Sequence, residues 1–363
     1  MKIFIVRGGF LNPFELQNYV PLKKKHDIQA VSSKYPISDK IDLPLIKLWS
    51  PTDIPNIPFK YPILNRLFTD AHQLFGLEKI IKGADIVHVA ETYYGYTHQA
   101  IMAKRRGLVK KVVSTVWEII PHNNEGIRGR KKFKKLARES IDHFIAVTDL
   151  AKSALIKEGV LPKKISVIRV GLDLTKFKPS LVKSTKRDLH LLCVARLVPE
   201  KGVEDLLSAF IELSKNIKNV HLTFVGDGPL KADLSGYKNV HVKQVSYGKM
   251  ANEYRRADIF CLPSRRTRTW EEQYGMVLIE AMACGLPIVT TATGAIQEVC
   301  EHAVLYAKPS DPHSLKINLE KLLGDQKLRE KLGHLARQRA LQNFNQLQVA
   351  KKINVVYQNL LRH

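Results

Sequence analysis

The chain has 363 residues, 45% of them hydrophobic, and this length predicts two domains that each bury a core. No run of about 18 apolar residues occurs, so we expect no membrane-spanning helix, and the apolar run Ile3–Val6 is too short for a signal peptide. The net charge of +24 predicts a surface that attracts polyanions. The four cysteines have neither metal-binding nor redox spacing, which predicts buried thiols in a cytoplasmic protein: Cys193, Cys261, Cys284 and Cys300.

Short β-rich segments alternate with helical segments along the chain. In the first half, strands are predicted at Lys2–Val6, Asp27–Val31, Asp85–Val89, Lys111–Trp117, His143–Val147 and Ile165–Val170. In the second half they are predicted at Leu189–Ala195, Val220–Val225, Ile259–Leu262 and Pro287–Thr291. Helical spacing appears between many of them, as in the apolar stripe Val203, Leu206, Leu207, Phe210 and Leu213. This alternation predicts an α/β fold with parallel sheets.

Two segments interrupt the alternation. Ile37–Phe59 is rich in proline and predicts an irregular excursion. Pro179–Arg187 is polar and has no period, which predicts a boundary between domains. We therefore expect Rossmann-like domains at residues 1–175 and 185–345, followed by a C-terminal helix within 346–363.

Basic residues are concentrated in one part of the first half. From Lys104 to Arg138 the sequence has twelve Lys and Arg residues and two acidic ones. The densest part, Arg128–Arg138, has two interpretations. It is a solvated surface, or it meets a phosphate-bearing acceptor or anionic lipid on the inner face of the membrane, where each basic residue adds about 1 kcal/mol. Nucleic acid is not an expected partner, because the chain has no RNP-like motif and no metal finger.

Two cations follow the predicted strand Leu189–Ala195. Ligands of open α/β sheets bind at the carboxyl ends of strands, and Arg196 and Lys201 both lie just after this end. Arg offers a planar fork and Lys a point charge, a combination that suits a diphosphate, although both could also be ordinary surface cations. Gly226, after the next strand, either lets the backbone approach a ligand or simply turns the chain.

A helix with a strongly apolar pattern is predicted after Gly275. The N-terminus of a helix offers free N–H groups and a positive dipole end to phosphate oxygens, and the amides of Met276 and Val277 would be those groups. Glu280 lies inside the helix and Glu272 lies in the loop before it, so their carboxylates can accept hydrogen bonds from hydroxyl groups on either side of a diphosphate. A structural cap or ion pair is the alternative for Glu280.

Together these segments resemble the retaining GT-B glycosyltransferases of family four, also described as glycosyl transferases group 1. The resemblance rests on Glu272 and Glu280 with seven residues between them, followed by AMACGLP, and on ARLVPEKG, VGDGPL, GAIQE and VIRVGLDLTKFKP in the family's order. It covers about residues 140–363. It implies two facing Rossmann-like domains with a donor cleft between them, and a last helix that crosses back onto the first domain.

The resemblance also implies roles for individual residues. Arg196 and Lys201 would bind the donor diphosphate and stabilise its charge as it leaves. Glu272, the third residue with a catalytic role, would contact hydroxyl groups of the transferred sugar, and Glu280 would hold the ribose. Gly9 would approach the diphosphate from the first domain. The residues expected to bind the donor are Gly9, Arg196, Lys201, Gly226, Gly275, Met276, Val277 and Glu280.

The implied reaction moves a sugar, most simply a hexose, from a UDP- or GDP-sugar to a glycan, lipid-linked or polysaccharide acceptor with retention of configuration. Negative charge develops on the diphosphate, and preorganised cations and N–H dipoles are suitable stabilisers. No Asp-x-Asp motif is present, so we expect neither a metal nor another cofactor, with Arg196 and Lys201 taking the role of the metal.

The first half departs from the family. Many members have a histidine after the strand that here ends at Trp117, whereas this chain continues with Glu118 and, later, His122. Either residue could contact the sugar or the acceptor, or the segment could be a structural turn. Two other functions stay open: a nucleotide-sugar epimerase on the same fold, and a non-catalytic protein that binds anionic membranes through Arg128–Arg138.

Overall fold

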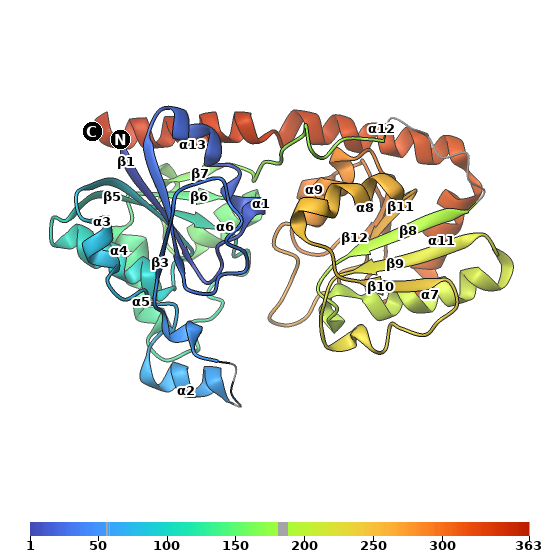
Figure 1. The fold of residues 1–363 in the computed structure, drawn as a ribbon, viewed down its shortest axis with the longest axis horizontal. Coiled ribbons are helices and arrows are strands. Elements are labelled where there is room, and N and C mark those ends of the chain that lie inside the picture. Colours follow the sequence, from blue (N-terminus) through green and yellow to red (C-terminus); the bar gives the residue numbers. More distant parts are fainter. Residues whose placement is uncertain (56, 58, 181–187, 363) are drawn as a thin grey trace. The chain divides into compact units, whose positions relative to one another are not determined.

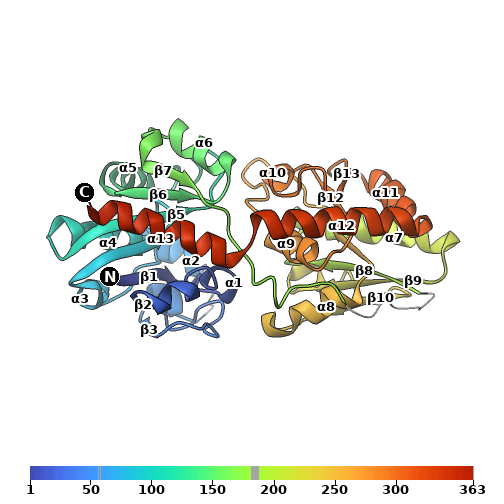
Figure 2. The same ribbon diagram turned by 90° about the horizontal axis from the view of Figure 1, so that it is seen from above.

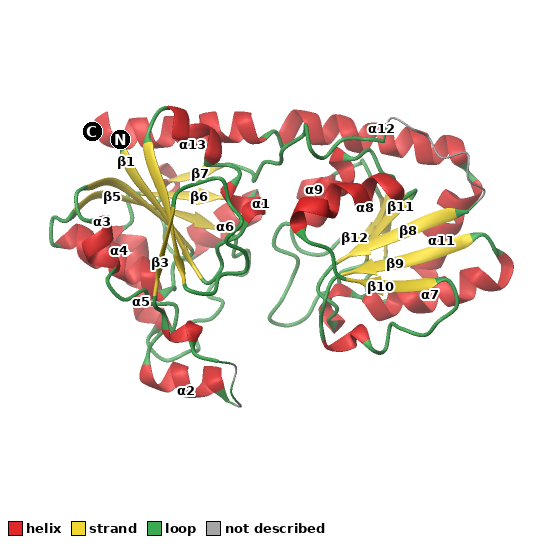
Figure 3. Ribbon diagram, viewed as in Figure 1, coloured by secondary structure: helices red, strands yellow, loops and turns green. Residues whose placement is uncertain are grey.

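The structure is a computed structural model that describes residues 1–55, 57, 59–180 and 188–362. The chain forms two compact units, one made of Met1–Gly171 with Gln346–His363 and the other of Leu172–Asn345 (Figure 1). The predicted break at Pro179–Arg187 lies outside the described residues from position 181 onward. Each unit is a parallel sheet with helices packed on it (Figure 3), which confirms the predicted pair of Rossmann-like domains.

The first unit contains a seven-stranded sheet with the strand order β3-β2-β1-β4-β5-β6-β7, in which all neighbours are parallel. This is the Rossmann order with one additional strand. The strands are β1 (Lys2–Gly8), β2 (Asp27–Ser33), β3 (Leu45–Leu48), β4 (Ala84–Ala90), β5 (Val109–Val116), β6 (His143–Ala146) and β7 (Ile165–Val167). Ile3 and Ile5 of β1 face one core while Phe4 and Val6 face another, which is why the strand is apolar throughout.

Helices cover both faces of this sheet. One face packs against α3 (Leu77–Ile81), α4 (Gly95–Arg105), α5 (Arg130–Ser140) and α6 (Asp149–Lys157). The other packs against α1 (Pro13–Leu16), the 3-10 helix η1 (Val20–Lys24) and α13 (Gln346–Arg362). Figure 2 shows α13 running along the first unit. The remaining elements of the unit are η2 (Pro51–Asp53), α2 (Lys60–Leu67) and η3 (Pro162–Lys164).

The second unit contains a six-stranded parallel sheet with the order β10-β9-β8-β11-β12-β13, again the Rossmann order. Its strands are β8 (Leu189–Val194), β9 (Val220–Val225), β10 (Val240–Lys243), β11 (Ile259–Leu262), β12 (Ile288–Thr291) and β13 (Leu305–Ala307). Its helices are η4 (Pro199–Lys201), α7 (Val203–Asn216), η5 (Pro229–Lys231), η6 (Tyr247–Lys249), α8 (Met250–Arg256), α9 (Met276–Ala283), α10 (Ile296–Cys300), α11 (Pro312–Gly324) and α12 (Gln326–Asn343). The stripe predicted between Val203 and Leu213 lies on α7 and is buried in the core under this sheet.

All ten predicted strands are present, with ends that differ by at most three residues. Three further strands were not predicted, namely β3, β10 and β13. All three are edge strands of three or four residues whose side chains are largely half-exposed, so they show neither an apolar run nor a clear alternation. The prediction that Ile37–Phe59 is wholly irregular is wrong, because β3 and the Ser50-capped helix η2 lie within it.

Candidate active site

The second sheet reverses its strand order between β8 and β11, which pair with each other. In open α/β sheets, ligands bind outside the carboxyl ends of the strands at such a switch point. The segment after β8 carries Arg196 and Lys201, and the segment after β11 carries Ser264 and Glu272. The fold therefore brings residues that are distant in sequence to one edge of one sheet.

Lys201 and Glu272 form the centre of this site. The Lys201 ammonium lies 2.6 Å from Oε2 of Glu272, and both side chains are nearly buried. Ser264 donates a second hydrogen bond of 2.9 Å to the same oxygen. The Lys201 ammonium also lies 4.7 Å from the ring centroid of Trp270, so Trp270 borders the site. A buried ion pair with extra hydrogen bonds is held in one geometry, so Lys201 is fixed as a point charge at the switch point.

Two glycines hold the segments that carry this pair. A Cβ atom on Gly202 would lie 2.0 Å from the carbonyl oxygen of Pro263, so only glycine lets η4 approach the end of β11. A Cβ atom on Gly294, which has φ +54°, would lie 2.2 Å from the carbonyl oxygen of Glu272. The next residue, Ala295, donates its N–H to that same oxygen at 2.8 Å. The backbone of Glu272 is thus clamped by the GAIQE segment, which explains why this segment needs its glycine.

Arg196 is placed differently from Lys201. Its side chain is 62% exposed and contacts Glu200 at 3.3 Å, one turn along. Exposed pairs of this kind contribute about 0–1 kcal/mol, so the guanidinium is free to turn toward an anion. Arg196 and Lys201 therefore lie on the same segment, but the Lys201 side chain is held in place whereas the Arg196 side chain can move.

Gly226 has a packing function in the structure. Its Cβ position would lie 1.8 Å from the carbonyl oxygen of Ala195, so the backbone after β9 lies directly against the backbone after β8. The N–H of Leu197 donates to the carbonyl oxygen of Asp227 at 2.8 Å and joins the same two segments. Gly226 thus fixes the position of the Arg196 segment whether or not it also meets a ligand.

The first turn of α9 is open. Gly275 is its N-cap residue with φ +76°, and no side chain caps the helix. Within the described part of the chain, neither Met276 nor Val277 has a hydrogen-bond partner for its amide. The Cβ position of Gly275 lies 3.8 Å from Cγ of Glu272, so these free amides adjoin the Lys201–Glu272 pair. Free amides and the positive dipole end of a helix favour an anion at this place.

Glu280 lies further inside α9 and is buried. The hydroxyl of Tyr254 on α8 donates to its Oε2 atom at 2.7 Å. Burial raises the pKa of Glu280 to about 7, against the opposing effect of the hydroxyls of Tyr254 and Tyr247 and of the Lys176 charge. Glu280 is therefore a carboxyl group whose charge changes near neutral pH.

The other predicted residues belong to the first unit. Gly9 follows β1. Glu118 follows β5 and is buried, with its two carboxylate oxygens accepting hydrogen bonds from the N–H of Ile120 at 2.9 Å and from Nδ2 of Asn123 at 2.8 Å. His122 is exposed, has φ +60°, and contacts Glu125 at 3.2 Å through Nδ1. Of this pair only His122 presents its side chain to solvent.

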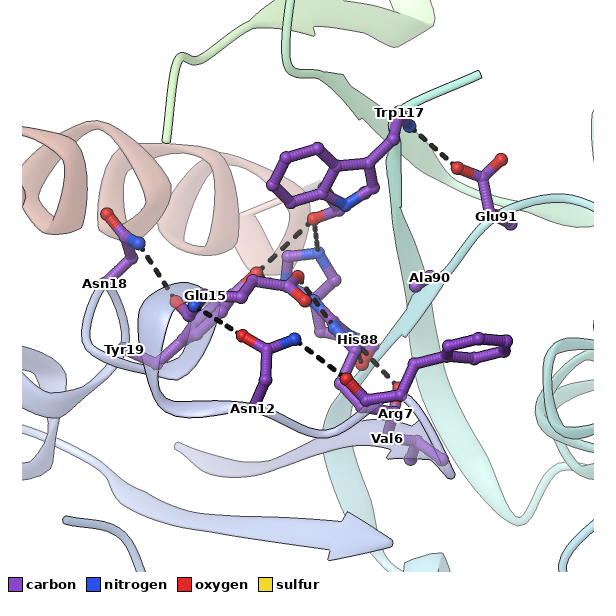
Figure 4. A network of polar contacts seen from close by, with 12 residues as sticks. Val6, Arg7, Asn12, Glu15, Asn18, Tyr19, His88, Ala90, Glu91 and Trp117 are labelled. Carbon is purple, nitrogen blue, oxygen red and sulfur yellow. Dashed lines mark hydrogen bonds and ion pairs between the residues drawn. The ribbon is translucent and has the colours of Figure 1, made fainter. Parts of the chain in front are cut away.

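A buried polar network lies under the carboxyl ends of β1, β4 and β5 (Figure 4). The guanidinium of Arg7 contacts Glu15 at 2.7 Å and donates to the Tyr19 hydroxyl at 2.9 Å. His88 contacts Thr115 at 2.8 Å and Tyr357 of α13 at 2.5 Å. Burial lowers the pKa of His88 well below its usual value, so His88 is neutral and structural. This network fastens α13 to the first sheet.

Three residues of these sites were given no role in the sequence analysis. Glu91 is the first residue after β4 and Ser264 the second after β11, so the rule that selected Arg196, the second residue after β8, could also have selected them. Tyr254 lies on α8, and its bond to Glu280 depends on the packing of α8 against α9, for which the sequence has no local signal.

The geometry defines a class of protein: two α/β units, each with a parallel sheet in the Rossmann strand order. The chain belongs to the glycosyltransferases: the family described as Glycosyl transferases group 1 matches residues 175–339, and Glycosyltransferase Family 4 matches residues 22–176. Both families are those that the sequence motifs predicted.

Individual relatives agree with this assignment. The chain is 24% identical over 332 residues to the phosphatidylinositol N-acetylglucosaminyltransferase gpi3 subunit of Schizosaccharomyces pombe, covering 88% of this chain and 68% of that protein. It is 28% identical over 213 residues to the putative colanic acid biosynthesis glycosyltransferase WcaL of Escherichia coli, covering 56% of this chain and 52% of that protein. The chain thus spans about half the length of the latter.

Solved structures confirm the GT-B fold. HepE of Anabaena, solved in complex with UDP-glucose, has a TM-score of 0.77 at 17% sequence identity, covering 99% of this chain and 100% of that chain.

None of the helices in the described ranges is long and apolar enough to cross a membrane.

Proposed function

We propose that this protein is a retaining glycosyltransferase that moves a sugar, most simply a hexose, from a UDP- or GDP-sugar to a glycan, lipid-linked or polysaccharide acceptor without a metal ion. The observation that carries the proposal is the buried Lys201–Glu272 pair beside the uncapped start of α9. A fixed cation, an oriented carboxylate and free amides at the switch point of a Rossmann sheet match the parts of a nucleotide diphosphate sugar.

The proposed roles follow from how each group is held. Lys201, fixed by Glu272, would act as a point charge on the diphosphate, and the exposed Arg196 would turn onto it as a second cation. The amides of Met276 and Val277 would donate to phosphate oxygens. When the bond between sugar and diphosphate breaks, negative charge grows on the phosphates, and these preorganised donors stabilise it in the transition state.

Glu272 would orient the transferred sugar. Its Oε2 atom accepts hydrogen bonds from Lys201 and Ser264, whereas its Oε1 atom accepts none from the residues that the structure describes and could bind sugar hydroxyls. Its negative charge would also favour positive charge on the sugar ring as the bond breaks. We do not propose Glu272 as a nucleophile, because the two-carboxylate mechanism of glycosidases is a different chemistry.

Glu280 would accept the ribose hydroxyls, and this role gives a pH prediction. Since burial raises the pKa of Glu280 to about 7, the carboxyl group is charged above pH 7 and neutral below it. A charged acceptor binds hydroxyls more strongly, so we expect the dissociation constant of the donor to rise about tenfold from pH 8 to pH 6. Titration calorimetry at several pH values measures this, and Glu280→Gln is the control that should show weak binding at every pH. An equal pH dependence in both proteins would contradict the role.

The proposal for the acceptor rests on the names of two relatives and on the basic residues of the first unit. The two relatives named above carry names that refer to a phosphatidylinositol and to colanic acid. An acceptor attached to lipid would bring the protein to a membrane surface, and we therefore propose a cytoplasmic protein at the inner face of the membrane. The surface to examine for this is the basic stretch Arg128–Arg138.

The structure divides this basic stretch into two groups. Arg130, Lys134 and Arg138 are committed to ion pairs with Asp70, Glu158 and Glu125 within the first unit. The other four cations are exposed, namely Arg128, Lys131, Lys132 and Lys135. Four of the seven cations therefore fit the solvated or membrane-facing interpretation, whereas the other three are structural.

An exposed apolar row lies next to these cations. Phe59, Ile63 and Leu67 on or before α2 are spaced by four residues and are 77%, 47% and 71% exposed. The chain just after α2 is joined to the start of α5 by the 2.8 Å contact between Asp70 and Arg130. Figure 1 shows that α2 projects from the first unit. An exposed apolar row beside exposed cations has the chemistry of a surface that enters an anionic bilayer.

The membrane surface can be tested with variants. Lys131→Gln, Lys132→Gln and Lys135→Gln together should lower binding to vesicles of phosphatidylglycerol and phosphatidylcholine by about a hundredfold, at roughly 1 kcal/mol per lysine. Phe59→Ser, Ile63→Ser and Leu67→Ser together should also weaken binding. Co-sedimentation measures both. The matched control is Lys351→Gln with Lys352→Gln, exposed lysines on α13 that should have little effect. Equal binding by all variants would remove this surface from the proposal.

The reaction itself is tested by product analysis. Purified protein is incubated with UDP- and GDP-sugars in the presence of EDTA, with and without a lipid-linked oligosaccharide acceptor. Transfer of the sugar with retained configuration supports the proposal. A changed sugar still attached to its nucleotide, formed without acceptor, would instead identify an epimerase. Vesicle binding without any turnover of donor would identify a non-catalytic membrane protein.

A further inference from the structure

A loop of the first unit, residues 68–76 between α2 and α3, lies at the carboxyl ends of the strands. The carbonyl oxygen of Ala71 accepts the hydroxyl of Ser50, which follows β3, at 3.2 Å. The carbonyl oxygen of His72 accepts the N–H of Tyr96, which follows β4, at 3.0 Å. β4 pairs with β1 at the point where the strand order of this sheet reverses. The loop therefore lies at the edge where ligands of Rossmann folds bind.

Asp70 and His72 form a hydrogen-bonded pair in this loop. Oδ1 of Asp70 lies 3.1 Å from Nδ1 of His72 and also accepts the backbone N–H of His72 at 2.9 Å. The N–H of Gly95 donates to the same oxygen at 2.9 Å, and Arg130 pairs with Oδ2 at 2.8 Å. The Asp70 side chain is completely buried. Both of its oxygens are therefore committed within the protein, and the imidazole is tied to a fixed carboxylate.

The charge of Asp70 decides which ring nitrogen of His72 carries the proton. Burial raises the pKa of Asp70, but the contacts with His72 and Gly95 and the charge of Arg130 together hold that pKa below its usual value. An ionised carboxylate can only accept hydrogen bonds, so the proton of the neutral imidazole lies on Nδ1. The other ring nitrogen, Nε2, is then a hydrogen-bond acceptor.

The Nε2 atom of His72 is open to a ligand. It has no hydrogen-bond partner among the residues that the structure describes, and it is not one of their buried unpaired polar atoms. The His72 side chain is 15% exposed, and this small exposed part includes Nε2. Ligand sites are built from a few placed polar groups of this kind among apolar side chains.

Two aromatic rings pack against the imidazole. Phe10, which follows β1, stacks on His72 with 4.8 Å between the ring centroids, and Tyr94, just before α4, lies 5.1 Å from it. Phe10 and Tyr94 also stack on each other at 5.0 Å. Phe10 is 37% exposed, so it presents an apolar surface beside the open imidazole. This combination suits a sugar or inositol ring, which has C–H groups on its faces and hydroxyl groups around its edge.

We propose that His72 binds the acceptor: its Nε2 atom accepts a hydrogen bond from a hydroxyl group of a sugar or inositol ring, and Phe10 packs on the face of that ring. Asp70 is a positioning residue, because it contacts only the protein and fixes the imidazole. That the ring belongs to the acceptor rests on the proposed function. An acceptor that presents only a phosphate does not fit, because Arg130, the cation of this cluster, is already paired with Asp70.

Binding to His72 can be measured by NMR without donor and without turnover. The full-length protein is isotopically labelled in its histidine rings, and the signals of His72 are those that disappear in His72→Asn. In mildly alkaline buffer we expect a neutral ring with its proton on Nδ1. Methyl α-glucoside and myo-inositol are then added as ring probes, and at least one should shift the Nε2 signal. Open-chain sorbitol should leave the signal in place, because it has no ring face to pack on Phe10.

Transfer kinetics provide the functional readout. His72→Asn keeps an amide that can donate to Asp70 but has no atom at the Nε2 position. We expect kcat/KM for a lipid-linked oligosaccharide acceptor to fall about tenfold, the effect of one lost hydrogen bond, with the donor dissociation constant unchanged. The longer amide of His72→Gln reaches the Nε2 position and should recover most of the activity. Phe10→Leu, which leaves the Asp70–His72 pair intact, should raise the acceptor KM about threefold.

The matched control is His98→Asn. His98 lies on α4 of the same unit and also stacks on an aromatic ring, that of Phe133 at 4.3 Å, so its loss should change acceptor kinetics by no more than about a factor of two. Circular dichroism checks that each variant is folded. The proposal is overturned if the proton lies on Nε2, if neither ring probe shifts the Nε2 signal, or if sorbitol shifts it equally.

Kinetic results can also contradict the proposal. A folded His72→Asn protein that keeps its acceptor kcat/KM, or that loses donor affinity to the same extent, would show that His72 does not bind the acceptor. Equal losses in His72→Asn and His72→Gln would assign His72 a structural role. If no donor is turned over at all, the proposed function fails, but the titration with ring probes still decides whether His72 binds a ring that carries hydroxyl groups.

Discussion

Lys201→Ala is expected to lower kcat/KM for the donor by about a thousandfold, the effect of removing one preorganised donor from a developing negative charge. In this protein the loss has a second cause. Lys201 pairs with Glu272, and both side chains are nearly buried, so the variant leaves a carboxylate without its counter-ion in the site that we propose for the diphosphate. An uncompensated buried charge would repel the proposed donor as well as destabilise the fold.

The matched control for Lys201→Ala is Lys231→Ala. Lys231 lies in the same unit, but its side chain is 49% exposed and its contact with Asp227 is 3.9 Å long. We expect activity within a factor of about two of wild type, since exposed pairs contribute little. Steady-state kinetics with a single donor measures both variants, and thermal unfolding shows whether each is folded. A folded Lys201→Ala protein that keeps more than a tenth of the wild-type kcat/KM would contradict the assigned role.

Gly294→Ala is expected to damage the site through the backbone rather than through charge. A methyl group there would lie 2.2 Å from the carbonyl oxygen of Glu272, and the residue has φ +54°. The left-handed conformation costs about 1–2 kcal/mol for a residue with a side chain, and overpacking adds about 1–3 kcal/mol. We expect both a loss of stability of about 2–5 kcal/mol and a fall in donor turnover, because Glu272 must move.

Gly236→Ala separates the two contributions. Gly236 also has a left-handed conformation, with φ +86°, but its Cβ position has no atom within 4 Å. It should therefore lose only the conformational part of the stability, about 1–2 kcal/mol, and keep its activity. Urea unfolding and donor kinetics on both variants provide the comparison. If the two variants behaved alike, the contact between Gly294 and Glu272 would not be what holds the carboxylate.

The sequence was most informative where a chemically distinctive residue lies near the end of a predicted strand or the start of a predicted helix. Arg196 and Lys201 lie in the connection between β8 and α7, and Gly275 directly precedes α9, so their position at a sheet edge follows from local pattern. The internal strands were equally visible, because burial on both faces makes them apolar throughout. The edge strands β3, β10 and β13 lack this signal, because one side of each has no neighbouring strand.

The contacts that define the site could not be read from the sequence. The bonds of Ser264 to Glu272 and of Tyr254 to Glu280 join residues that pack together only in the folded unit. The same holds for the division of Arg128–Arg138, where Arg130 and Lys134 look like surface cations in sequence but pair with Asp70 and Glu158 inside the unit. The left-handed backbone of Glu91, with φ +59°, has no sequence signature either, since a glutamate in a left-handed turn is not a residue that propensity would select.

The proposed function depends most on the donor site that we assign to the second unit, and titration calorimetry tests that site directly. UDP- and GDP-sugars are titrated in EDTA into the wild-type protein and into Lys201→Ala and Glu280→Gln at pH 8. We expect at least one nucleotide sugar to bind the wild-type protein without metal, and each variant to bind it about tenfold or more weakly. Binding that is equal in all three proteins, or that appears only when a divalent metal is added, would contradict the proposed metal-independent donor site.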